Sequence, residues 1–173
     1  MANFETAFTR TLENEGGFIL HKVKDDSGGW TYAGISENYW PNWEGWPLVK
    51  SGREEETTSM VKDFYRKNFW NKINGDQIKS DKIAYNIYDF AVNAGTKTSA
   101  KLAQRILGVS SDGLIGPISL KAINDIKEKD EEVFEMKFAL TKIARYAGIG
   151  NKNKTQTKFL LGWTNRTLKV LQS

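Results

Sequence analysis

The fold is decided first by residues 3–18, which read NFETAFTRTLENEGGF. The apolar residues of this stretch recur at the spacing of one buried helix face, and they are Phe4, Ala7, Phe8 and Leu12. At about 100° per residue, Glu15 projects into the same stripe. Gly16-Gly17 is a typical stop signal for a helix. The sequence therefore predicts an amphipathic helix that ends with a carboxyl group on its core-facing side.

Glu15 is an acid at a position where the pattern favours an apolar side chain, whereas Glu13 points to the opposite side of the helix. Burial disfavours the charged form of a carboxyl group, and a group that keeps its proton can act as a general acid. A helix end that reaches solvent, or a pairing with a lysine, would explain Glu15 equally well. The pattern of this helix alone does not distinguish a general acid from a solvated or lysine-paired carboxylate.

Residues 25–36 read DDSGGWTYAGIS and lack helical periodicity. Asp26 followed by Ser-Gly-Gly is typical of a tight turn, which could be its whole role. Thr31 and Tyr32 lie between two glycine turns, which favours a short strand or hairpin. A helix-end Glu, a loop Asp and a nearby Thr are also the groups that cleavage of a glycosidic bond requires.

These motifs, in this order, resemble glycoside hydrolase family 108, whose pattern reads Glu-Gly-Gly-Tyr, Asp-Pro-Gly-Gly-x-Thr and Gly-Ile-Thr. The family is understood to consist of N-acetylmuramidases, which are lysozyme-like enzymes of phages and bacteria that cut peptidoglycan. The resemblance implies catalytic roles for three residues, which are Glu15, Asp26 and Thr31. The chain departs from the pattern at Phe18 and Ser27, and its Glu-to-Asp gap is longer. The longer gap leaves Asp25 as a rival for Asp26.

The resemblance continues through residues 87–95, which read IYDFAVNAG and are similar to the family's Phe-Asp-x-x-Val-Asn-x-Gly segment. Residues 107–117, LGVSSDGLIGP, resemble the peptidoglycan-binding region that usually follows. We therefore expect a glycoside hydrolase region at residues 1–92 and a helical peptidoglycan-binding region at residues 93–173, packed against it. The substrate-binding residues that we expect are Tyr32, Tyr88 and Asn93. Asn93 could equally cap its helix.

The rest of the chain predicts further helices, over residues 54–70, 80–95, 100–107, 117–126, 133–148 and 159–171. Trp40, Trp43 and Trp46 could line a sugar-binding groove, although packing of their loop onto the body is favoured. The predicted fold class is mainly α, a lysozyme-like helical fold with a short β-hairpin or extended loop near residues 26–36.

Composition excludes several classes of site. The chain has 173 residues, no cysteine and one histidine, His21, so a disulfide framework, a thiol nucleophile and a histidine metal cluster are not expected. We expect no cofactor. The net charge of +4 is spread along the chain without a basic helix face, so nucleic acid is not an expected partner.

The N-terminus begins an amphipathic helix rather than a secretory signal, and no stretch approaches the ~20 apolar residues of a membrane span. We therefore expect a monomer that is synthesised in the cytoplasm without a signal peptide. Its expected partner is the glycan strand of peptidoglycan. It would act on the cell wall after release, as endolysins of phages do.

Together these features predict a lysozyme-type muramidase that hydrolyses the bond between N-acetylmuramic acid and N-acetylglucosamine. Glu15 would protonate the leaving oxygen. Asp26 would activate water or stabilise the oxocarbenium-like transition state, and Thr31 would position that water or Asp26. Two alternatives stay open: a lytic transglycosylase, which needs only one Glu, and a non-catalytic peptidoglycan-binding module.

Overall fold

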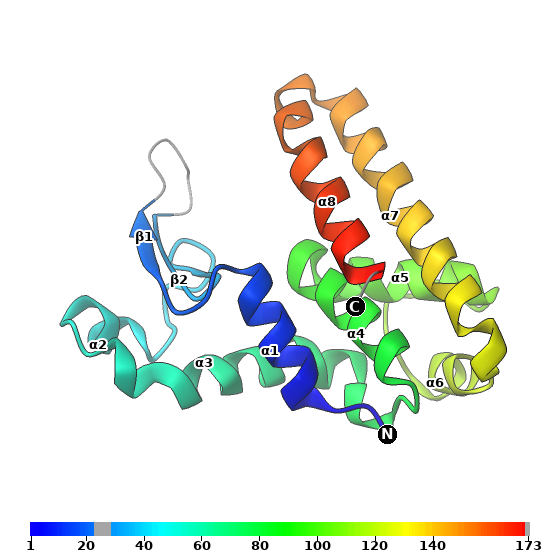
Figure 1. Ribbon diagram of the computed structural model, residues 1–173, viewed down its shortest axis with the longest axis horizontal. Coiled ribbons are helices and arrows are strands. Elements are labelled where there is room, and N and C mark those ends of the chain that lie inside the picture. Colours follow the sequence, from blue (N-terminus) through cyan, green and yellow to red (C-terminus); the bar gives the residue numbers. More distant parts are fainter. Residues whose placement is uncertain (23–28, 172–173) are drawn as a thin grey trace. The chain divides into compact units, whose positions relative to one another are not determined.

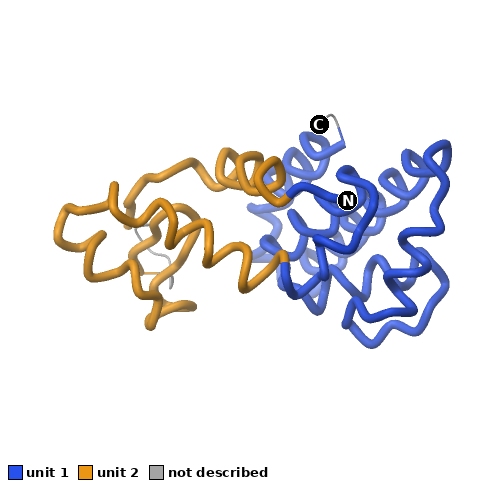
Figure 2. Tube along the Cα trace, turned by 90° about the horizontal axis from the view of Figure 1, so that it is seen from below, with its two compact units in different colours: residues 1–3, 71–173 blue, residues 4–70 orange. Residues whose placement is uncertain are grey.

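The computed structural model describes residues 1–22 and 29–171. The chain forms two compact units (Figure 2). Unit 2 comprises Phe4–Trp70, and unit 1 comprises Met1–Asn3 with Asn71–Ser173. The predicted division into a glycoside hydrolase region at residues 1–92 and a peptidoglycan-binding region at residues 93–173 stays a prediction.

Unit 2 begins with helix α1 (Phe4–Asn14) and a small antiparallel sheet (Figure 1). The strands are β1 (Leu20–Lys22), β2 (Trp30–Tyr32) and β3 (Ile35–Ser36), with β2 in the middle. Helices α2 (Trp46–Lys50) and α3 (Thr58–Tyr65) follow, and a π-helical turn over Arg66–Trp70 prolongs α3. The sheet includes the hairpin predicted near residues 26–36, as far as the described residues extend.

Aromatic rings in and around the core of unit 2 pack at centroid separations of 4.8–6.4 Å. These rings belong to Phe4, Phe8, Tyr32, Trp40, Trp43, Trp46, Phe64, Tyr65 and Trp70. Trp43 packs on Tyr32, and the Trp46 indole N–H donates to the Trp40 carbonyl oxygen at 2.8 Å. The tryptophan loop therefore packs onto the body, the use that the sequence favoured.

Unit 1 is helical. Its α-helices are α4 (Asp81–Ala94), α5 (Thr96–Leu107), α6 (Pro117–Asn124), α7 (Glu131–Lys152) and α8 (Leu160–Leu171). The Ser80 hydroxyl caps α4 by accepting from the Ile83 N–H at 3.3 Å, and Pro117 begins α6. Among the described residues, no helix is long and apolar enough to cross a membrane. The predicted fold class, mainly α and lysozyme-like with a small β element, is confirmed.

Helix α7 differs from its predicted bounds, because it passes through Gly148 and ends only at Lys152. The stop signal fails there because α7 packs along α8, which offsets the cost of about 1 kcal/mol for a glycine inside a helix. Gly150 lies where the neighbouring segment approaches the helix closely. A Cβ atom at Gly150 would lie only 3.3 Å from side-chain carbons of Thr157 and Leu160.

A buried charged cluster joins three helices of unit 1. The Arg166 guanidinium of α8 donates to Asp89 Oδ1 of α4, at 2.9 Å from Nη2 and 3.2 Å from Nε. Lys142 Nζ of α7 lies 3.9 Å from Asp89 Oδ2 and 5.4 Å from the centre of the Phe90 ring. Burial lowers the pKa of Lys142 to about 8, although the Asp89 carboxylate opposes this shift. The folded protein therefore holds this proton less tightly than the unfolded chain does.

The first prediction follows from this lysine. Below pH 8, Lys142 is protonated in both the folded and the unfolded state, and the folded state bears the full cost of the buried charge. As pH rises, the folded state loses the proton first, so the free energy of unfolding should rise by about 2 kcal/mol between about pH 8 and pH 10. Lys142→Met should abolish this rise. Denaturant unfolding of both proteins at several pH values measures it.

Lys137→Met is the matched control, since Lys137 is an exposed lysine on the same helix. The difference in the free energy of unfolding between Lys137→Met and the parent should stay constant over that pH range. Parallel curves for the parent and Lys142→Met would contradict the prediction.

Candidate active site

Glu15 is the residue at which helix α1 ends. The Gly17 N–H donates to the Leu12 carbonyl at 2.9 Å, and the Gly16 N–H donates to the Glu13 carbonyl at 3.3 Å. Gly16 has φ +87°, so this is the Schellman arrangement, in which a left-handed glycine follows the last helical residue. The Glu-Gly-Gly motif therefore fixes the backbone of Glu15 where the helix stops.

Glu13 and Glu15, at the end of α1, differ in burial. Glu15 is partly buried, whereas Glu13 is exposed. The last buried residue before Glu15 is Thr11, which has no exposed surface, and Leu12 is only partly buried. Thr11 and Glu15 are four residues apart, so they lie on the same face of the helix.

The β2–β3 turn packs against Glu15. It consists of Ala33 and Gly34, with φ values of +48° and +76°, and it joins the paired residues Tyr32 and Ile35. Two successive positive φ values are typical of a type I′ hairpin turn. A Cβ atom at Gly34 would lie 2.9 Å from both Cβ and Cγ of Glu15 and 2.5 Å from Tyr65 Oη. Only glycine fits here, because the Glu15 side chain and the Tyr65 hydroxyl approach the same point.

Thr31 belongs to the polar face of the sheet. It pairs with His21 of β1 and Ser36 of β3, and residues directly opposite each other project to the same side. The opposite face carries Tyr32 and Ile35, which are 1% and 0% exposed. Thr31 is partly exposed, so its hydroxyl is placed on the outer side of the strand next to the Ala33–Gly34 turn.

Tyr32, an expected substrate contact, lies in the core of unit 2. Its hydroxyl donates to the Glu54 carbonyl at 3.3 Å and accepts from the Thr57 hydroxyl at 3.2 Å. In this conformation the Tyr32 side chain packs in the core, on the buried face of the sheet. Contact between Tyr32 and substrate stays a prediction. Asp25 and Asp26 lie outside the described residues.

Tyr88 and Asn93, the other expected substrate contacts, are on α4 in unit 1. Tyr88 has no exposed surface. Asn93 is partly exposed near the end of the helix, and its Oδ1 accepts from the Tyr146 hydroxyl at 2.9 Å. Burial raises the pKa of Tyr146 to about 12, so this hydroxyl stays a donor at neutral pH. Asn93 thus ties α4 to α7, and its role toward substrate stays a prediction.

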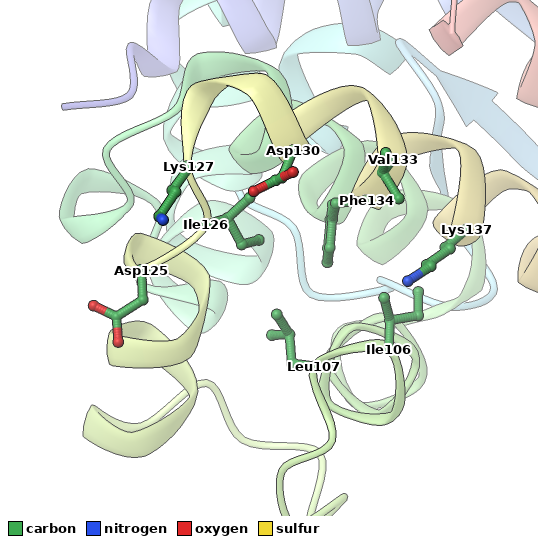
Figure 3. Close-up of a pocket in the computed structure, with 9 residues that line it drawn as sticks. All are labelled: Ile106, Leu107, Asp125, Ile126, Lys127, Asp130, Val133, Phe134 and Lys137. Carbon is green, nitrogen blue, oxygen red and sulfur yellow. The ribbon is translucent and has the colours of Figure 1, made fainter.

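A groove of about 360 Å³ also occurs in unit 1, between the end of α5 and the start of α7 (Figure 3). The side chains that line it include the apolar Leu107, Ile126 and Phe134 and the basic Lys127 and Lys137. Of the predicted site residues that the structure describes, none lines it.

The described part of the site therefore brings Glu15 and Gly34 together in unit 2, and Thr31 lies in the strand that leads into the Ala33–Gly34 turn. In the sequence, Gly34 is part of the DDSGGWTYAGIS motif, and Tyr65 lies within the helix predicted over residues 54–70. The signal for Gly34 was its place in a two-residue turn between strand-like residues. Tyr65 lies more than thirty residues from that turn along the chain, so no local pattern points to their contact.

Comparison with known proteins gives two family matches. Residues 8–95 match the family described as Glycosyl hydrolase 108, and residues 98–168 match the one described as Predicted Peptidoglycan domain. No curated protein matches significantly. Among solved structures, the chain is similar to one described as the structure of Brucella abortus SagA. The two chains are 29% identical with a TM-score of 0.78, over 98% of this chain and 91% of that chain.

The second prediction concerns the turn beside Glu15. Gly34→Ala should destabilise the protein by about 1–3 kcal/mol through overpacking, in addition to about 1 kcal/mol for a left-handed alanine. Because the new methyl group displaces Glu15, lysis of cell-wall suspensions should also fall about 10²-fold. Denaturant unfolding and the decrease in turbidity measure the two effects.

Gly52→Ala is the matched control. Gly52 has the same φ of +76°, but a Cβ atom there would meet nothing within 4 Å. This variant should bear only the conformational cost and keep its lytic rate. Equal losses in both variants would mean that the contact with Glu15 is unimportant.

Proposed function

Because this chain belongs to the glycosyl hydrolase 108 family, we propose that it is an N-acetylmuramidase. At the level of the family it is a glycosidase that acts on peptidoglycan. The proposal specifies the bond, which is the one between N-acetylmuramic acid and N-acetylglucosamine, and assigns Glu15 as the general acid.

The observation that carries the proposal is the placement of Glu15. Its backbone is fixed by the helix cap, its Cβ and Cγ pack against Gly34, and the side chain is only partly buried. An acid catalyst needs this combination, because a carboxyl group that is fixed but still partly accessible can be presented to a substrate oxygen. Thr31 lies in the strand that leads into the same turn.

In the proposed reaction, Glu15 gives its proton to the glycosidic oxygen as the bond from that oxygen to the anomeric carbon breaks. Asp26 activates a water molecule or stabilises the positive charge that develops at that carbon. Thr31 positions this water or the Asp26 carboxylate. The water oxygen then bonds to the anomeric carbon, its proton passes to a carboxylate, and N-acetylmuramic acid becomes a reducing end.

The biological role that we propose is lysis of the cell wall, as performed by endolysins. The match to a peptidoglycan domain at residues 98–168 supports it, since such a region would keep the enzyme on an insoluble substrate. The proposed place of action is the wall, reached after release from the cytoplasm.

Mass analysis of the fragments released from purified peptidoglycan tests the proposed bond. A muramidase yields fragments with a reducing N-acetylmuramic acid. A lytic transglycosylase would yield anhydro fragments that are lighter by one water, and a glucosaminidase would leave N-acetylglucosamine at the reducing end. A wall-binding protein that releases no fragments would overturn the enzymatic proposal altogether.

The third prediction distinguishes Glu15 from Glu13. Glu15→Gln should lower the lytic rate by about 10²–10⁴-fold, the contribution of general acid–base catalysis. Glu13→Gln is the control and should stay within a few-fold of the parent, because Glu13 is exposed on the other face. Comparable losses for the two variants in a turbidity assay would exclude the proposed role of Glu15.

The fourth prediction concerns the second carboxylate. Asp26→Asn should lower the rate by ~10²-fold or more, and Asp25→Asn by far less. The reverse order would assign the role to Asp25. No loss in either variant would favour the transglycosylase reaction, which needs only one acid.

A further inference from the structure

We propose that Tyr65 is a positioning residue for the reaction, because its buried hydroxyl holds the turn that supports Glu15. This inference rests on the proposed function, in which Glu15 is the general acid. It adds a residue from helix α3 to a site that otherwise comes from α1 and the sheet.

The turn needs an external support. Ala33 has φ +48°, a left-handed conformation that asparagine, aspartate and glycine adopt readily but alanine does not. The sequence at this position therefore opposes the conformation that the turn adopts. Strain of this kind persists only where surrounding contacts fix the backbone.

Tyr65 supplies that contact. Its hydroxyl donates to the Ala33 carbonyl oxygen at 2.8 Å, and the side chain is 1% exposed. The same hydroxyl lies beside Gly34, next to the Glu15 side chain. A buried hydrogen bond to the strained residue thus fixes the plane of the peptide that joins Ala33 to Gly34.

The ring of Tyr65 is itself held by the helix that carries Glu15. Its centroid lies 5.8 Å from that of Phe8, on α1, and 5.5 Å from that of Phe64, on α3. One side chain therefore contacts both the helix that ends at Glu15 and the turn that packs against it. Without the hydroxyl, the ring would still fill its place, but Ala33 could relax and Gly34 would move relative to Glu15.

Tyr65→Phe tests this link, since it removes only the hydroxyl. With soluble peptidoglycan fragments as substrate, kcat should fall about tenfold or more, because small displacements of a catalytic group are costly. KM should stay within about twofold, since Tyr65 does not reach the substrate. In the Tyr65→Phe background, Ala33→Gly should raise kcat by about threefold or more, because glycine keeps the turn without support.

Ser99→Ala is the matched control. The Ser99 hydroxyl is buried and donates to the Ile87 carbonyl at 2.6 Å, so this variant loses a bond of the same kind in unit 1. It should lose stability but keep kcat. A purely structural Tyr65 would give the same pattern as Ser99, without rescue by Ala33→Gly.

The inference would be overturned if the folded Tyr65→Phe protein had an unchanged kcat. It would also be overturned if the double variant, Tyr65→Phe with Ala33→Gly, were no faster than Tyr65→Phe, or if neither variant folded. If only the Tyr65→Phe protein fails to fold, the double variant decides. A double variant that folds and keeps about a third of the parent kcat supports the inference. A double variant that folds but stays tenfold or more below the parent overturns it. A parent protein that releases no fragments would instead refute the proposed function.

Discussion

Two backbone hydrogen bonds at the end of α1, from Gly17 to Leu12 and from Gly16 to Glu13, are the constraint on which the site depends. They require glycine with positive φ immediately after Glu15, and Gly17 also has positive φ. The chain consequently leaves the helix at one fixed residue and turns toward the sheet. A carboxylate inside the helix would lie on a solvated face. At the helix cap, by contrast, the Glu15 side chain packs against the β2–β3 turn.

Support for the site in unit 2 comes from aromatic packing. Phe8 on α1 contacts Tyr65 on α3, while Tyr32 of β2 contacts Trp43 of the tryptophan loop. Rings of this size contribute large buried areas, and they also have defined relative orientations. The helix end and the strained turn are therefore held by the same core. Stability and the geometry of the candidate site are coupled in unit 2, which is common where a site carries backbone strain.

Unit 1 uses a different device, a buried carboxylate shared between a buried lysine and a partly buried arginine. Asp89 accepts from Arg166 and lies near Lys142, and four residues further along α4 Asn93 accepts from Tyr146. A buried ion pair gains little net stability, because the desolvation cost is comparable to the attraction. What the cluster provides is a definite pairing of α4 with α7 and α8. Asp89 and Asn93 of the IYDFAVNAG segment thus have partners inside unit 1.

The sequence by itself determined what depends on near neighbours along the chain. Residues 3–18 contain the periodicity and the glycine cap that form α1 and end it at Glu15, and Ser80 and Gly95 bound α4 in the same way. Only the tertiary structure decided that Tyr32 is buried, that α7 continues through Gly148, and that the Tyr65 hydroxyl reaches Ala33. Caps and periodicity act over a few residues, so they can be read locally. Burial and long-range hydrogen bonds depend on which distant segments meet, and that is settled only when the whole core packs.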